Sequence, residues 1–301
     1  MSRAYVPLLL LLSAFWGASF MFIKVADRVF EPWTLMAGRL LVAAAVIVPF
    51  VAAQVGARHL AHELRRLWLP ALVLGVASAA LPFTLIAWGE KHVDSGVAAI
   101  GNASMPIWVA LLALRFIREE RVSGLRLVGV LVAIVGVAVL VGVHPRGGWW
   151  GVVGTVAVVL AAVSYAASLL YSQRVVDRTD ATVLTTASIV AATLVLLPVG
   201  AARLPGHVPN WKELGSVIAL GVLGTAIGQL IYFRMMAAFG SARTSLVTYL
   251  LPVTALFYGV TLLGEPLTVE EVVGLVLILG GVALGAGLVR VQREEPAAAA
   301  P

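Results

Sequence analysis

The chain has no cysteine and very little charge, and each absence excludes a class of protein. Without cysteine there is no disulfide, no thiolate nucleophile and no cysteine-ligated zinc or iron–sulfur site. Only 12% of the 301 residues are charged and 61% are hydrophobic, whereas about a quarter of the residues of a soluble domain are charged. So few charges cannot cover a water-facing surface, which indicates that the chain lies in lipid.

Signatures of catalysis and of nucleic-acid binding are also missing. No P-loop of the form G-x-x-x-x-G-K-[S/T] occurs, so ATP does not drive the protein directly. There is no Ser–His–Asp set, no metal motif and no buried carboxylate pair. The net charge of +6 forms no basic stripe with interleaved aromatics. All histidines fall in predicted loops: His59, His62, His92, His144 and His207. We predict that the protein is not an enzyme and has no catalytic residues, no metal, no cofactor and no nucleic-acid partner.

Long apolar runs recur along the whole chain. A helix needs about 20 apolar residues to cross the hydrocarbon core of a bilayer. Ten runs approach or exceed that length: 5–23, 32–57, 67–89, 95–114, 127–143, 147–173, 181–202, 214–233, 244–264 and 272–289. The first run is too long for a signal peptide and no clear cleavage site follows it. We therefore predict ten transmembrane helices, followed by a disordered cytoplasmic tail at 291–301.

The basic residues are distributed unevenly between the two sides of these ten predicted helices. With the N-terminus in the cytoplasm, 14 Lys and Arg lie in inside segments and 6 in outside segments, and Arg39 lies within a run. Positive charge is enriched on the cytoplasmic side of membrane proteins. We predict a multi-pass protein of the cytoplasmic (inner) membrane with both termini in the cytoplasm.

The two halves of the chain can be aligned with each other. At an offset of 149 residues Trp16, Ser19 and Pro49 match Tyr165, Ser168 and Pro198. At 146 the matches are Gly75, Pro82, Asn102 and Pro106 with Gly221, Gly228, Thr248 and Pro252. At 145 Glu120, Gly129 and Gly136 match Glu265, Gly274 and Gly281. The alignment predicts a first repeat at 1–143 and a second at 144–290. Because each holds five helices, an odd number, the second repeat must be inverted in the membrane, as in secondary transporters.

Paired helix breakers lie inside the predicted helices. Pro106 and Pro252 each remove a backbone donor and free a carbonyl. Pro82 matches Gly228, so the two helices that carry them are expected to bend at the same depth. We predict these four residues as hinges or cavity walls. The alternative is that they only shape the bundle, because membrane helices tolerate Pro and Gly.

The same residues resemble a known family. Ala14-Phe15-Trp16-Gly17-Ala18-Ser19-Phe20 followed by Lys24 is similar to the first-helix signature of the EamA-type branch of the drug/metabolite transporter superfamily. Further matches are the segment 32–39, Pro106, Pro252, Glu120…Gly129…Gly136 and Gly264-Glu265…Gly274…Gly281. The resemblance covers residues 14–287, with Glu119-Glu120 in place of a Gly-Glu pair. It implies two inverted five-helix repeats around a central cavity, and transport of amino acids, other small metabolites or drugs, often by export.

Polar and aromatic residues within the apolar runs are candidates for substrate binding. Trp16 and Ser19 share a helix face because they are three residues apart, and Tyr165 and Ser168 repeat that pattern. The remaining uncharged candidates are Asn102, Gln229, Tyr232, Thr248 and Tyr249. Small polar residues also join membrane helices by packing and hydrogen bonding, so helix contact is the alternative reading.

Arg39 is the charged residue inside a predicted span. It follows Pro32 by seven residues, or roughly 10 Å along a helix. A charge at that depth is by default a functional hypothesis, and we predict that it binds a substrate carboxylate. The alternatives are that it snorkels to the outer interface, or pairs with Glu31 or Glu90.

The 15 acidic residues all fall in predicted loops, tails or helix ends. Strong proton coupling through a midplane carboxylate is therefore not expected. Facilitated diffusion, exchange, and coupling through Glu90 or Asp94 at the outer rim stay open. Glu120 and Glu265 are predicted to cap the N-termini of the runs at 127–143 and 272–289, where the helix dipole favours a negative charge.

Taken together, these features predict an all-α secondary transporter that works by alternating access. The substrate is expected to be an amino acid or a similar zwitterionic or aromatic metabolite, and export is the expected direction. The alternative is a helical membrane receptor or scaffold that transports nothing. Gly281-x-x-x-Gly285 suits a close helix contact within a monomer, or a homodimer through the fifth and tenth runs.

Overall fold

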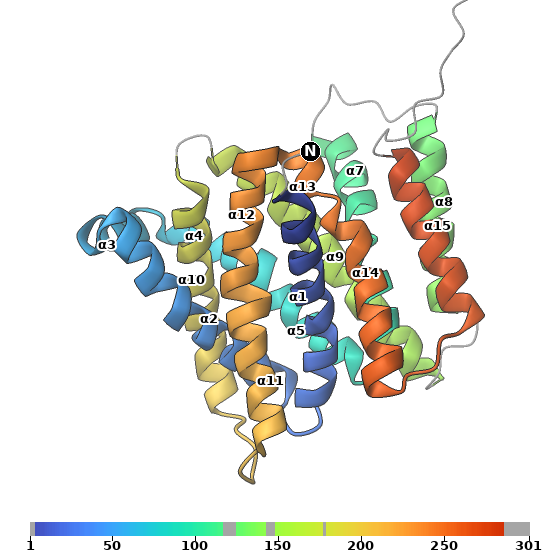
Figure 1. Cartoon of the computed structure of the whole chain (residues 1–301), viewed down its shortest axis with the longest axis horizontal. Coiled ribbons are helices and arrows are strands. Elements are labelled where there is room, and N and C mark those ends of the chain that lie inside the picture. The colour runs from blue at the N-terminus through green and yellow to red at the C-terminus, as the bar shows by residue number, and fades with distance from the viewer. Residues whose placement is uncertain (1–3, 117–124, 143–147, 177–178, 286–301) are drawn as a thin grey trace, which may run out of the picture.

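The computed structural model describes residues 4–116, 125–142, 148–176 and 179–285 (Figure 1). All regular secondary structure in these residues is helical. The predicted tail at 291–301 lies outside them, as does Glu120 with its predicted capping role. The structure therefore tests the predicted helices, but not the predicted tail or the predicted capping role of Glu120.

The helices follow one another with short connections. The first half contains α1 (Tyr5–Ala26), α2 (Pro32–Val55), α3 (Ala57–Arg66), α4 (Trp68–Gly75), the π-helix η1 (Val76–Ala80), α5 (Leu81–Glu90), α6 (Ser95–Asn102), α7 (Met105–Phe116) and α8 (Leu125–Gly142). The second contains α9 (Trp149–Val176), α10 (Ala181–Ala201), α11 (Trp211–Gly221), the π-helix η2 (Val222–Ile227), α12 (Gly228–Phe239), α13 (Ser241–Thr244), α14 (Val247–Tyr258), the π-helix η3 (Gly259–Leu263) and α15 (Val269–Gly285).

Many of these helices are apolar enough to lie in a membrane. Within the described residues, seven segments are also long enough to cross it: Tyr5–Ala26, Pro32–Val55, Trp68–Glu90, Ser95–Ala113, Trp149–Gln173, Ala181–Ala201 and Trp211–Phe239. Two shorter apolar helical segments cover Leu127–Leu140 and Val247–Leu263. The prediction of an all-helical, multi-pass membrane protein is confirmed, whereas the total of ten spans stays a prediction.

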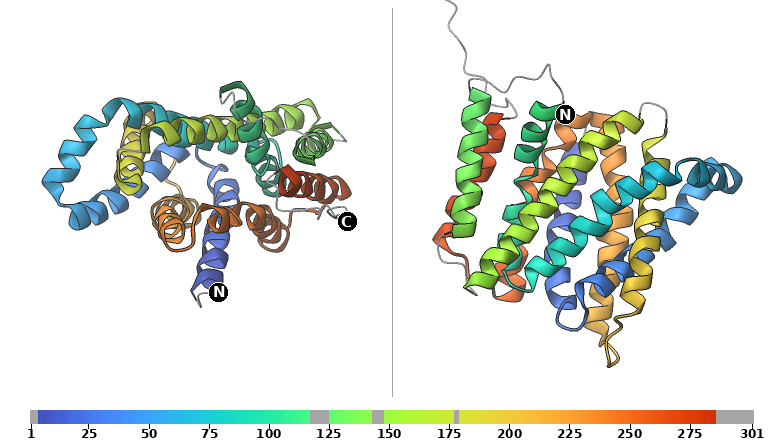
Figure 2. Two further views of the ribbon diagram at one scale, coloured as in Figure 1. Left: turned by 90° about the horizontal axis from the view of Figure 1, so that it is seen from above. Right: turned by 180° about the vertical axis from the view of Figure 1, so that it is seen from behind.

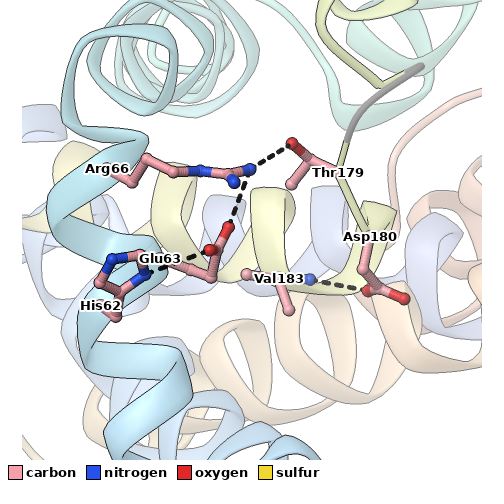
Figure 3. Close-up of polar contacts among 6 residues, drawn as sticks. All are labelled: His62, Glu63, Arg66, Thr179, Asp180 and Val183. Atoms are coloured by element: carbon pink, nitrogen blue, oxygen red, sulfur yellow. Dashed lines mark hydrogen bonds and ion pairs between the residues drawn. The ribbon is translucent and has the colours of Figure 1, made fainter.

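The basic segment between α2 and α4 forms helix α3, so the expectation that His59 and His62 lie in a loop is wrong. Leu60 is buried on one face of α3, and Glu63 forms an ion pair of 3.1 Å with Arg66 one turn later. Such spacing stabilises a short helix. Figure 3 shows that Arg66 also reaches Thr179, just before α10. No group of three metal-ligating side chains occurs in the described part of the chain.

Helix packing in one half is repeated in the other. α2 packs along α10, and α8 along α15, so corresponding helices meet across the molecule. Other contacts are also matched between the halves. The contact of α1 with α14 matches that of α9 with α6 and α7. The contact of α5 with α9 matches that of α12 with α1, and the contact of α4 with α10 matches that of α11 with α2. α8 and α15 form one edge of the bundle, and α3 lies at the opposite edge (Figures 1 and 2).

Corresponding helices run in opposite directions. The Tyr5 hydroxyl at the start of α1 donates to the carbonyl of Arg243 at 2.9 Å, and Lys24 near its end donates to the carbonyl of Val93 at 2.8 Å. Gly154 near the start of α9 packs against Gly89, only four residues before Val93. α9 therefore begins at the end of the bundle where α1 finishes, as Figure 2 also shows.

In each half, three consecutive helices form one continuous rod: α4–η1–α5 in the first half and α11–η2–α12 in the second. A matched glycine brings each rod close to a neighbouring helix. Gly75, the last residue of α4, lies against the carbonyl of Ser188 in α10. Gly221, the last residue of α11, lies against the carbonyl of Arg39 in α2. Gly75 and Gly221 are aligned in the internal repeat, and so are Arg39 and Ser188. A π-helix follows directly in both rods, as η1 and η2. Gly228 comes directly after η2, whereas Leu81 separates Pro82 from η1.

The matched prolines differ from expectation in their surroundings. The helix is interrupted at residues 103–104, and Pro106 is the second residue of the new helix α7. A helix start suits proline, because the amide there has no helical partner. Pro252 instead lies inside α14, which continues from Val247 to Tyr258. The two prolines therefore do not mark equivalent breaks.

The helices α8 and α15 meet through small residues. A side chain at Gly281 would collide with the backbone carbonyl of Gly129 and with Ala133, and one at Gly136 would collide with Ile278. The close approach expected at Gly281 is thus made within the chain. A homodimer through these two helices stays a prediction.

Candidate substrate site

Arg39 lies two turns into α2 and points into the bundle, and it is only 6% exposed. Its Nε donates a hydrogen bond of 2.9 Å to Oγ1 of Thr225, in η2 of the other half. Glu31 contacts Lys91 instead, at 3.9 Å, and the Glu90 carboxylate has no hydrogen-bond partner among the described residues. Arg39 therefore neither reaches the outer interface nor pairs with these two acids.

The π-helix η2 shapes the partner of Arg39. The Thr225 hydroxyl donates its own proton to the carbonyl of Leu220 at 3.0 Å, five residues earlier. Its oxygen is thereby left with lone pairs that accept from Nε of Arg39. The local geometry of one half thus orients the charged side chain of the other half.

Aromatic rings flank the guanidinium. The ring of Phe83, in α5, lies 3.8 Å from Cζ of Arg39, a cation–π arrangement. The ring of Tyr165, in α9, packs edge-on against Phe83 with centroids 6.4 Å apart. The ring of Phe83 thus links Tyr165 to the guanidinium. We call Arg39, Phe83, Tyr165 and Thr225 the central cluster; it joins α2, α5, α9 and η2.

A second aromatic pair adjoins the central cluster through glycines. The rings of Trp16 in α1 and Tyr232 in α12 have centroids 5.5 Å apart. Gly228 sits against the indole nitrogen of Trp16, so a larger residue there would collide with the ring. Gly224, one turn earlier, lies between Ser19 and the guanidinium of Arg39. Ser19 therefore lies close to Arg39, and the Trp16–Tyr232 pair lies one helical turn further along α12, on the matched helices predicted for the site.

The two serines use their hydroxyl protons within their own helices. Ser19 donates to the carbonyl of Phe15 at 3.1 Å, and Ser168 to that of Tyr165 at 2.8 Å. Both are buried, at 6% exposure. They can still accept a hydrogen bond, but neither presents a free donor.

The interactions found for the other predicted site residues in the described parts of the chain lie outside the central cluster. Thr248 donates to the carbonyl of Ser245 at 2.7 Å, and Tyr249 packs on an apolar group formed mainly by α6, α7, α8 and α15. Gln229 is half-buried. Oδ1 of Asn102 is buried and has no hydrogen-bond partner among the described residues. Their part in substrate binding stays a prediction.

The sequence reasoning missed Phe83 and Thr225. Phe83 follows Pro82 directly, so an aromatic beside a predicted hinge was an available signal. Thr225 had no such signal, because a threonine in an apolar run usually bonds its own helix. Only the approach of α2 to η2 gives it a charged partner.

At the end of the bundle where α5 finishes, an acidic side chain is enclosed by the protein. Glu90, the last residue of α5, is completely buried, and neither carboxylate oxygen has a hydrogen-bond partner in the described residues. Lys24 is nearby, but its ammonium group donates to the backbone carbonyls of Glu90 and Val93. A position at a helix end therefore did not imply exposure.

Glu265 also differs from its prediction. Its carboxylate does not cap α15; it accepts from the backbone N–H of Ser95 at 3.0 and 3.1 Å and from the Ser95 hydroxyl, at the start of α6. The α15 terminus is capped by Thr268 and Glu271, whose side chains each accept from the other's backbone at 3.2 Å. Glu265 thus stabilises a helix terminus in the opposite half.

This arrangement of apolar membrane helices around a buried arginine is that of a multi-pass membrane protein with an internal polar site. The sequence model of the EamA-like transporter family matches residues 3–142 and 152–286. The chain therefore belongs to the EamA-like transporter family, as its motifs indicated. Membership indicates a transporter rather than an enzyme.

Relatives and a solved structure agree with this assignment. A "Probable terminal-alkyne amino-acid exporter" of Streptantibioticus cattleyicolor is 30% identical over 89% of both chains. A "Probable amino-acid metabolite efflux pump" of Salmonella typhimurium is 25% identical over 97% of this chain and 98% of its own. An "Uncharacterized transporter" of Archaeoglobus fulgidus is 26% identical over 89% of this chain and 93% of its own. One crystal structure, 19% identical, matches the fold with a TM-score of 0.66 over 96% of this chain and 98% of its own.

Proposed function

We propose that the protein is a secondary transporter that exports an amino acid or a similar zwitterionic or aromatic metabolite across the cytoplasmic membrane. The single observation that carries the substrate class is Arg39, a buried guanidinium that donates one hydrogen bond to the protein among the described residues. Guanidinium has five N–H donors in a fork that fits a carboxylate. The remaining donors are suited to the carboxylate of a bound substrate.

The surrounding aromatic rings are suited to the part of the substrate other than its carboxylate. Phe83 and Tyr165 on one side, and Trp16 and Tyr232 on the other, offer apolar faces with polar edges. Small-molecule sites are mostly apolar, with a few placed polar groups that fix orientation. A substrate with one carboxylate and a small apolar or aromatic side chain fits this combination. The relatives named as amino-acid exporters favour the same class.

The matched helix contacts support ten spans arranged as two inverted five-helix repeats, at 1–143 and 144–290. α8, α15, and α14 with η3 add three apolar rods to the seven longer segments. Such repeats carry alternating access in many transporters, with the substrate between the halves near the midplane. Arg39 and Thr225 come from different halves, so rocking of one half against the other would change the site. Pro82, Pro106, Gly228 and Pro252 are the proposed bending points.

The experiment is substrate counterflow with purified protein in liposomes. Paired substrates are compared, such as phenylalanine and phenethylamine, which differ in the carboxylate. We expect counterflow of the amino acid and at least about a tenfold weaker response to the amine, since a charge-assisted hydrogen bond contributes about 1.5–3 kcal/mol. Equal transport of both compounds would contradict carboxylate recognition. No flux of any compound through correctly inserted protein would overturn the transporter proposal.

Variants separate the arginine from general damage. Arg39→Gln is expected to lower apparent affinity for the amino acid by about 30-fold or more, because a lost buried charge pair costs about 2–5 kcal/mol. Thr225→Val, which removes the group that orients Arg39, should have a smaller effect in the same direction. Ser188→Ala is the matched control. Ser188 aligns with Arg39 in the repeat, and its hydroxyl bonds only to its own helix, at Leu184.

Orientation can be measured directly because the chain has no cysteine. Val208, between α10 and α11, is 92% exposed, and the His62 side chain in α3 is 72% exposed. With both termini in the cytoplasm, a membrane-impermeant maleimide should label Val208→Cys in intact cells and His62→Cys only after lysis. The reverse pattern would contradict the proposed orientation.

A further inference from the structure

We propose that Glu90 is the site where a coupling proton binds, so that a pH gradient drives the transporter. This inference rests on the proposed transport function and adds its energy source. It comes from a buried carboxylic acid that has no hydrogen-bond partner among the described residues.

The carboxylate of Glu90 lies in a place that suits only its neutral form. Both oxygens are buried, and neither accepts or donates a hydrogen bond within the described residues. Enclosing an ionised carboxylate without partners costs far more than a protein can usually offset, so such groups become neutral. In this conformation Glu90 therefore carries a proton, and its ionised form requires a different arrangement of the outer end.

The nearest cation is held away from the carboxylate. The Lys24 ammonium donates to the backbone carbonyls of Glu90 and Val93, on either side of the turn between α5 and α6. Lys24 thereby ties α1 to this turn while the acid stays unpaired. A small shift of α1 or of the turn would let the ammonium reach the carboxylate. Movement of the outer end and ionisation of Glu90 are therefore linked.

Charged groups face Glu90 from each element that carries one. They are Lys24 in α1, Asp27 just after α1, Arg39 in α2 and Glu265 before α15. Two of these groups form hydrogen bonds elsewhere: Arg39 with Thr225, and Glu265 with Ser95 at the start of α6. Lys91 and His92 follow Glu90 in the chain, and Lys91 contacts Glu31 at 3.9 Å. Burial raises the pKa of Asp27 to about 6, so Asp27 is the other acid that a pH experiment must separate.

A proton fits this place better than a metal cation. Divalent cations need several oxygen ligands, and the described residues contain no group of three His, Asp or Glu side chains that could hold one. A proton needs only one oxygen. Binding forms an O–H bond on the carboxylate from a proton of the outer aqueous phase, and release restores the carboxylate and a free proton. Carboxylates that cycle in this way within membrane bundles are typical of proton relays.

Arg39 gives this proton an influence on the substrate site. Once ionised, Glu90 interacts electrostatically with the guanidinium of Arg39. Ionisation of Glu90 therefore changes the field at the group proposed to bind the substrate carboxylate. Proton binding at the outer end and substrate binding at the central cluster are coupled, and the coupling acts in both directions.

The test compares Glu90→Gln with wild type in proteoliposomes. In wild type, an imposed pH gradient should accelerate substrate flux in one direction, and flux should move protons. Glu90→Gln mimics the protonated acid. Its gradient-driven flux should be at least about tenfold lower than that of wild type, while substrate counterflow without a gradient persists. In detergent, substrate addition should change proton binding by up to about one per molecule in wild type and by none in the variant.

Matched variants decide the interpretation. Glu31→Gln makes the same chemical change at the same end of the bundle, on a side chain that is 55% exposed, and should keep the gradient response. Asp27→Asn should also keep it. The proposal is overturned if Glu90→Gln still responds to the pH gradient, if only Asp27→Asn loses the response, or if a sodium gradient alone drives wild-type flux. A wild-type protein that transports nothing would instead overturn the proposed function.

Discussion

The rod α4–η1–α5 and the rod α11–η2–α12 are built alike and differ in one backbone group. Each has a glycine in close contact with a neighbouring helix and then a π-helix, with Gly228 directly after the π-helix in one rod and Pro82 one residue further on in the other. In the second rod the N–H of Gly228 donates to the carbonyl of Leu223, five residues back. In the first, Pro82 has no N–H, and the hydroxyl of Ser164 in α9 donates to the equivalent carbonyl of Ala77 at 2.7 Å. The same backbone shape thus persists through two different hydrogen bonds.

The chemistry of the two rods differs more than their shape. Gly221 packs on the carbonyl of Arg39, whereas Gly75 packs on that of Ser188. Only the first of these contacts places a charged side chain beside a π-helix, where Thr225 accepts from it. The scaffold is repeated and the site is not. A duplicated framework can therefore carry a single binding group, oriented by the opposite half.

The largest expected effect tests whether the two glycine contacts are equivalent. Gly75→Ala and Gly221→Ala should each destabilise the protein by about 1–3 kcal/mol, because the new methyl group has no room against a backbone carbonyl. Thermal unfolding in detergent measures this. Gly215→Ala, also in α11 and with open space around it, should be neutral or slightly stabilising. A loss confined to one of the two contact variants would break the equivalence.

An effect of intermediate size tests whether the Ser164 hydroxyl takes the place of the backbone N–H that Pro82 lacks. Ser164→Ala leaves the carbonyl of Ala77 without its donor and should cost about 1–2 kcal/mol. In the background Pro82→Gly the same substitution should cost much less, since an N–H at position 82 can serve the carbonyl as Gly228 does in the other rod. A double-mutant cycle of unfolding free energies gives the coupling. Additive costs would show that Ser164 and position 82 act independently.

The smallest effect concerns the ends of the matched first helices. Asp27 directly follows α1. In the internal repeat, at the offset of 149 residues, Asp27 is aligned with the uncharged residue Val176. Burial raises the pKa of Asp27 from 3.8 to about 6, so the folded state favours its protonated form. The stability from that proton is complete below about pH 4 and is lost as the pH rises to about 6. Asp27→Asn should therefore add about 1 kcal/mol at pH 7.5 and little at pH 4. Equal gains at both pH values would rule out this cause.

Much of the fold was predictable because lipid imposes simple rules. Apolar runs gave the helical segments, and the repeat predicted which helices correspond. Pro82 and Gly228 were expected at matching bends, and both follow π-helices. The π-helices themselves carried no sequence signal, because their extra residue depends on which carbonyls find donors in neighbouring helices. Pro106 and Pro252 look identical in sequence but occupy a helix start and a helix interior.

The candidate site was predictable only in part. Arg39, Trp16, Ser19, Tyr165 and Tyr232 were chosen for polarity or aromaticity within apolar runs, and contacts join them at or beside the central cluster. Phe83 and Thr225 were missed, since neither residue type stands out in such a run. Glu90 was placed correctly at a helix end, but its complete burial there was not predicted, because burial depends on how neighbouring elements enclose the side chain.

The sequence by itself determined that this chain is a helical membrane protein of the EamA-like transporter family, because composition, run length and ordered motifs are local properties. The tertiary structure alone decided which polar groups meet. It gave Arg39 its partner in the other half, brought Glu265 to a distant helix terminus and enclosed Glu90 without a hydrogen-bond partner among the residues that the structure describes. Hydrogen bonding in a bundle depends on helix rotation and on approach between distant segments, and neither is written in the pattern of a single helix.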